Sequence, residues 1–111
     1  MDSILTSVKK MLGIDESYYH FDTDIIMHIN STLMILNQLG VGPTSGFTIT
    51  GPYEVWSDFI PEGRNLEAVK TYVYQKVRLI FDPPQGSAHL EALKNSIAEF
   101  EWRLNVAAES V

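Results

Sequence analysis

The chain has 111 residues, of which 45% are hydrophobic, and it carries a formal net charge of -6 and no cysteine. This length suffices for a single domain over residues 1–111 with one core, and the composition excludes a disordered chain. The lack of cysteine excludes a disulfide framework and a thiolate zinc site. The negative charge argues against a protein whose main function is to bind nucleic acid.

Membrane insertion and secretion have no support in the sequence. No apolar run approaches the roughly 20 residues that a membrane-spanning helix needs. Lys9 and Lys10 follow the first apolar residues, which is the reverse of a secretory signal. The sequence therefore predicts a soluble, cytoplasmic protein that makes no contact with a membrane.

Two helices are predicted in the first part of the chain. Apolar residues at helical spacing predict a short helix over residues 3–12, with Ser3 as its cap. A longer helix begins at Asp22 or Thr23 and ends at Gly40, which supplies a left-handed cap. Because apolar residues cover so much of its circumference, we expect this longer helix to be the central one.

Residues 40–64 form a long connection that contains five glycines and three prolines, which excludes a long regular helix. The alternation from Phe47 to Thr50 predicts a short strand or an extended arm, and residues 56–60 predict one tight helical turn. A connection of about 25 residues is far longer than those that usually join helices, and long connections tend to be functional.

The apolar side chains of this loop are too many to remain in water. Two arrangements stay open: the loop folds back as a lid over its own helices, or it buries these side chains in another subunit. In the second arrangement Tyr53 and Trp56 are the natural anchors. The candidate interface residues of the loop are Phe47, Ile49, Tyr53, Trp56 and Phe59.

Two more helices are predicted after the loop. Asn65 is expected to cap a helix that the Asp-Pro-Pro run at residues 82–84 ends sharply. Ser87 opens the last helix, whose apolar residues have a heptad-like spacing suited to packing along one neighbouring helix. A flexible tail is expected from about residue 106. The fold class predicted is mainly α, a small bundle of about four helices with a long Gly/Pro-rich loop.

The pattern of polar residues gives little support to a metal-binding, catalytic or nucleic-acid-binding site. Asp24 and His28 lie four residues apart on a predicted helix, but two ligands are too few for a metal site, so we interpret them as surface residues. No phosphate-binding loop, nucleophile elbow or metalloprotease motif is present, and we expect no enzyme and no cofactor. The cations Lys70, Lys76 and Arg78 could line a strip for single-stranded nucleic acid, but a solvated or inter-subunit salt-bridge face fits their spread around a helix better.

The order of these elements is similar to that of a known family. Its most specific pieces are WSDF at 56–59, KVRLIFDPP at 76–84 and FEWRLNV at 100–106. Over roughly residues 4–106 the chain resembles the small head-tail connector proteins, also called head completion or adaptor proteins, of tailed bacteriophages and prophages.

The resemblance implies a structural subunit of the virion, made in the host bacterial cytoplasm and placed at the head-tail junction. It implies a twelve-fold ring that binds the portal protein, extends the channel through which DNA passes without specific binding, and docks a downstream neck or tail protein. The long loop would contact neighbouring copies or the channel, and the last helix and tail, with Trp102 and Arg103, would attach to the portal. The alternative is a small helical adaptor or regulatory protein that acts through protein contacts outside a virion.

Overall fold

The computed structural model describes residues 3–109, and within this range the chain is mainly helical, as predicted. No strand forms among these residues, and the one isolated antiparallel bridge joins Ser3 to Val55. None of the described helices combines the length and the apolar content that crossing a bilayer requires. The helices are α1 (Ile4–Met11), α2 (Asp22–Gln38), α3 (Trp56–Phe59), α4 (Leu66–Phe81) and α5 (Ser87–Glu109).

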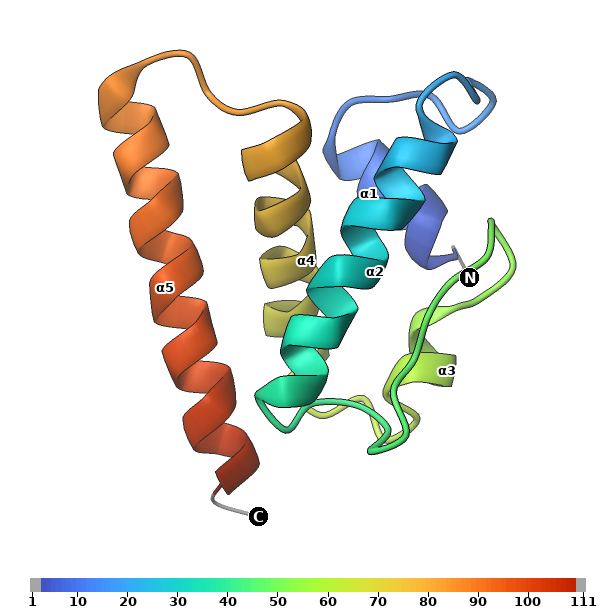
Figure 1. Cartoon of the computed structure of the whole chain (residues 1–111), viewed down its shortest axis with the longest axis vertical. Coiled ribbons are helices and arrows are strands. Elements are labelled where there is room, and N and C mark those ends of the chain that lie inside the picture. The colour runs from blue at the N-terminus through green and yellow to red at the C-terminus, as the bar shows by residue number, and fades with distance from the viewer. Residues whose placement is uncertain (1–2, 110–111) are drawn as a thin grey trace.

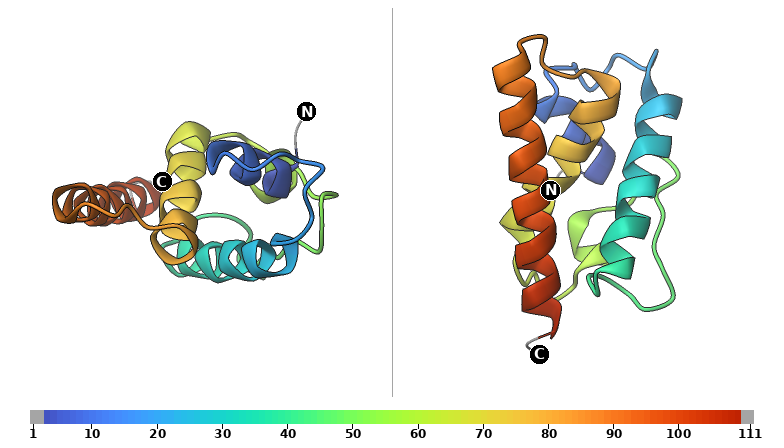
Figure 2. Two further views of the ribbon diagram at one scale, coloured as in Figure 1. Left: turned by 90° about the horizontal axis from the view of Figure 1, so that it is seen from above. Right: turned by 60° about the vertical axis from the view of Figure 1, so that its left-hand side comes forward.

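Helix α4 is the centre of the molecule, because α1, α2 and α5 all pack against it (Figures 1 and 2). The expectation that the Asp22–Gln38 helix would be central was wrong. Met27 and Met34 on α2 are more than half exposed, so one flank of its apolar surface faces solvent. Tyr72 on α4, by contrast, is fully buried.

Helix α1 is held to the loop that follows it by the buried side chain of Lys9. The Lys9 ammonium donates to the carbonyls of Glu16 (3.1 Å) and Tyr18 (2.7 Å), and it lies 2.8 Å from a carboxylate oxygen of Asp22. A buried charge is tolerated when it is paired and hydrogen-bonded in this way. The contact fixes residues 12–21 as an ordered loop, which we call the acidic loop because it carries Asp15 and Glu16.

The start of α2 differs from its prediction because Asp22 pairs with Lys9. Phe21 occupies the cap position and makes no side-chain capping bond, while Asp22 is the first helical residue. The Asp22 carboxylate is turned to Lys9 instead of capping the helix. At the other end of α2, Gly40 has a φ of +92° as expected of a left-handed cap.

The long loop is anchored by side chains instead of by strand pairing. The Asn30 side chain on α2 donates to the Ile49 carbonyl (3.0 Å) and accepts from the Ile49 N–H (2.7 Å). Both backbone groups of Ile49 are therefore satisfied without a partner strand. Of the two arrangements predicted for residues 47–50, a short strand or an extended arm, the strand does not form. Further along, the Glu54 carbonyl accepts from the N–H of Ile4 (2.9 Å), which ties the loop to the start of α1.

Helix α5 stands at one edge of the molecule and packs mainly on α4 (Figure 2, left). It begins at Ser87 as predicted and continues through Glu109, into the segment where a flexible tail was expected. Its contact with α4 is partly polar: the Tyr72 hydroxyl donates to Glu101 (2.6 Å), and burial together with this carboxylate raises the pKa of Tyr72 well above its usual range. Ile97 and Leu104 are its buried residues, so most of the α5 surface faces solvent.

Candidate functional site

Most of the aromatic and aliphatic residues proposed for the loop interface lie inside the chain's own core. Ile49, Trp56 and Phe59 are at most 3% exposed, and the half-buried Phe47 packs on Phe59 with ring centroids 5.4 Å apart. The Trp56 indole N–H donates to the Ser7 hydroxyl on α1 (3.0 Å). In this conformation the loop is a lid, and these side chains are not available to another subunit.

Tyr53 is the one proposed loop residue that points into solvent, with 76% of its surface exposed. It sits in a turn closed by the Glu54 carboxylate, which accepts from the Thr50 N–H (3.0 Å) and the Thr50 hydroxyl (2.9 Å). The Tyr53 ring covers Gly51 so closely that a Cβ there would come within 2.8 Å of it. The turn therefore presents an exposed aromatic ring, as an interface anchor requires.

The turn makes a testable contribution to stability. Partial burial opposes ionisation of Glu54, but the Thr50 N–H and hydroxyl, together with the N–H groups of Glu54 and Gly51, hold the pKa of this carboxyl below its ordinary value of 4.5. Its contribution is therefore present above pH 4.5 and is lost as the pH falls through the lowered pKa. We expect Glu54→Gln to destabilise the chain at neutral pH and the difference from wild type to shrink in acid, as measured by urea unfolding. A difference that stays constant with pH would contradict this, and Glu62→Gln at an exposed position is the control.

Helix α5 carries the second exposed aromatic residue proposed for an interface. Trp102 is 65% exposed, and Val106, one turn further along, is also exposed. The neighbouring Arg103 pairs with Glu99 on the same helix at 2.8 Å, and both ends of the pair are open to solvent. An uncovered Trp beside an Arg is the composition typical of the energetic centre of protein interfaces.

The two α4 cations proposed for an interface have different surroundings. Lys76 lies 3.8 Å from Glu101 on α5, so it helps to join two helices of the same chain. Arg78 donates to the Tyr74 hydroxyl (3.0 Å), and no carboxylate among residues 3–109 forms an ion pair with it. It lines a cleft of about 420 Å³ between α4 and α5 together with Pro84, Gln85, His89 and Leu93.

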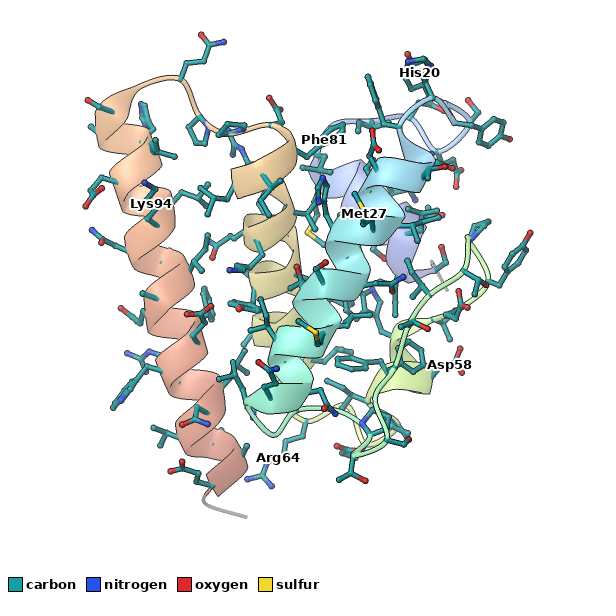
Figure 3. All side chains as sticks on the ribbon, in the orientation of Figure 1. His20, Met27, Asp58, Arg64, Phe81 and Lys94 are labelled. Atoms are coloured by element: carbon teal, nitrogen blue, oxygen red, sulfur yellow. The ribbon has the colours of Figure 1, made fainter. Side chains whose placement is uncertain are left out.

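The described residues also form a second cleft, lined partly by charged side chains. A cleft of about 450 Å³ lies where residues 40–42, the start of α4 and the end of α5 meet, with Arg64 and Glu62 among its lining residues; Figure 3 labels Arg64 at this end. Within the described part of the chain no three His, Asp or Glu side chains gather as metal ligands would. Asp24 is exposed and His28 is half-buried.

Comparison with known proteins points to one family. A family model described as Phage connector protein matches residues 4–111. No curated protein matches the chain. No solved structure matches it either.

Proposed function

Because the chain belongs to the phage connector protein family, a family of structural proteins, we propose that it forms a ring in the phage neck that joins the head to the tail. The ring binds the portal protein on one side and a downstream neck or tail protein on the other. It has twelve copies and extends the channel through which DNA passes. The observation that carries this proposal is the family match over nearly the whole chain.

The distribution of exposed aromatic residues supports assembly into a ring. The loop that carries Tyr53 lies at the edge of the molecule opposite α5, which carries Trp102 (Figure 1). The Tyr53 turn meets an unlike surface of the next copy, and head-to-tail contacts of this kind close into rings, whereas a two-fold dimer uses one self-complementary surface. We assign the Tyr53 turn to contact with the next copy and the Trp102 end of α5 to the portal.

The charge of the chain suits a channel for DNA. A net charge of -6 in each copy gives an assembled ring a strongly negative surface. Such a surface repels the phosphate backbone and lets a duplex move without adhering. The channel role needs no base contacts and no clustered cations.

The test is the mass of the protein in solution, measured by light scattering over a concentration series with and without a portal ring from the same phage. We expect rings, or monomers that join the portal at about one copy per portal subunit, since many weak contacts act together once a ring closes. Trp102→Ala should weaken portal binding about 30-fold or more while the chain stays folded. A chain that stays monomeric at all concentrations and does not bind the portal would overturn the proposal and favour an adaptor outside the virion.

A further inference from the structure

The cleft between α4 and α5 is lined by Arg78, whose guanidinium has N–H donors that no acidic group among the described residues uses. One Arg78 nitrogen donates to the Tyr74 hydroxyl, which orients the guanidinium, and the remaining donors face the cleft without an ion-pair partner among residues 3–109. A guanidinium offers five N–H donors in a planar fork that matches a carboxylate. The chain has 14 acidic and 8 basic residues, and Arg103 is already paired with Glu99, whereas Arg78 can accept an acidic group from outside the chain.

The acidic loop offers the complementary chemistry. Asp15 and Glu16 are exposed, and two tyrosines, Tyr18 and Tyr19, stand beside them with 48% and 72% of their surfaces in solvent. The Asp15 carboxylate accepts from the Ser17 N–H and hydroxyl, whereas the Glu16 carboxylate has no hydrogen bond or ion pair within the described chain. Glu16 is therefore an exposed acid without an ion-pair partner among the described residues, in a loop that Lys9 holds in place.

The two surfaces lie at the same end of the molecule but on opposite sides of it. The acidic loop and the start of α5 are at the same end of the molecule, and in the view from above they occupy opposite ends of its width (Figures 1 and 2). In a cyclic ring each copy is related to the next by rotation about one axis. With that axis along the length of α5, features at equal height on opposite edges of neighbouring copies face each other. This step rests on the ring proposed above.

We propose that the Arg78 cleft of one copy receives the acidic loop of the next, with the Glu16 carboxylate bound to the Arg78 guanidinium. Tyr18 and Tyr19 then pack against the arginine and Pro84, which adds aromatic contact to the ion pair. The occupant is a second copy of this chain, and the contact fixes which edge of each copy faces which edge of its neighbour. It is partly screened by solvent, so its strength falls with ionic strength.

A charge swap tests the pairing. Arg78→Glu alone and Glu16→Lys alone should each weaken self-association about tenfold or more, because like charges then face each other across the contact. The chain carrying both substitutions should regain most of the lost association. Lys94→Glu, which makes the same charge change at an exposed α5 position outside the cleft, should leave association unchanged. Single variants that associate normally while folded, or a double variant that is not restored, would overturn the inference.

Disulfide trapping gives a second readout that does not depend on charge. The chain has no cysteine, so Glu16→Cys and Gln85→Cys introduce the only thiols. Each substitution alone should give no cross-link on oxidation, whereas the chain with both should give a covalent ladder that ends at the ring. Dimers from a single variant would indicate a two-fold contact and overturn the inference.

The two proposals fail in different ways. Wild-type rings or portal binding without a ladder from the double variant would overturn the Glu16–Arg78 contact and leave the connector function standing. A wild-type chain that associates neither with itself nor with a portal ring would overturn both.

Discussion

Replacing Trp56 by Ala is expected to destabilise the folded chain by about 3–5 kcal/mol, the usual cost of truncating a large buried aromatic side chain. Trp56 is only 3% exposed, and its indole N–H holds the loop to Ser7 of α1. Removing the side chain leaves a cavity beneath the lid and removes the hydrogen bond that joins the loop to α1. Since small domains are stable by only about 5–15 kcal/mol, this one substitution removes a large share of the total.

The measurement is urea unfolding followed by circular dichroism, with Tyr53→Ala as the matched control. Tyr53 lies in the same loop but is mostly exposed, so its loss should change stability by less than about 0.5 kcal/mol. If Trp56→Ala unfolds at the same urea concentration as wild type and only assembly is lost, the lid arrangement is wrong and Trp56 belongs to an interface.

Replacing Lys9 by Met is expected to lower the free energy of unfolding by about 3 kcal/mol, although the two side chains have similar length. The cost is large because Lys9 is only 2% exposed. The change leaves the Glu16 and Tyr18 carbonyls without their donor and the Asp22 carboxylate without its cation. Removing one member of a satisfied buried set exposes the desolvation cost of the others.

Hydrogen exchange adds a local readout to this experiment. Amides of the acidic loop should exchange faster in Lys9→Met, because the loop loses the contact that orders it. Lys94→Met on the exposed surface of α5 is the control and should change neither stability nor exchange. Unchanged protection of residues 12–21 would show that the loop is ordered by something other than Lys9.

The helices were predictable because their apolar residues repeat at helical spacing and their ends carry recognisable residues. The first helix was expected over residues 3–12 and spans Ile4–Met11, with Ser3 accepting from the N–H of Thr6 as a cap (3.0 Å). The rank of the helices in the core was not predictable. The apolar content of α2 favoured it as the central helix, but burial depends on which helix faces meet. Met27 and Met34 add to this apolar content even though both are exposed.

The candidate site was predictable only as a set of residues. The sequence identified the loop aromatics, but it could not separate Tyr53 from Trp56, because that difference arises from contacts with residues far along the chain, such as Ile4 and Ser7. Lys9 was missed as well. It lies between Val8 and Leu12 on the apolar face of α1, four residues after Leu5, and a lone cation in that position is a signal of a buried partner.

The bonds between the start of the chain and residues 54–56 have a consequence for synthesis. An eight-residue helix such as α1 is marginal in water by itself, and its backbone and side-chain anchors lie in a loop that the ribosome makes about fifty residues later. The amino-terminal segment of the nascent polypeptide therefore stays unfolded until that loop has emerged. A translating ribosome stalled before residue 54 should carry a chain whose first helix is still open to proteases.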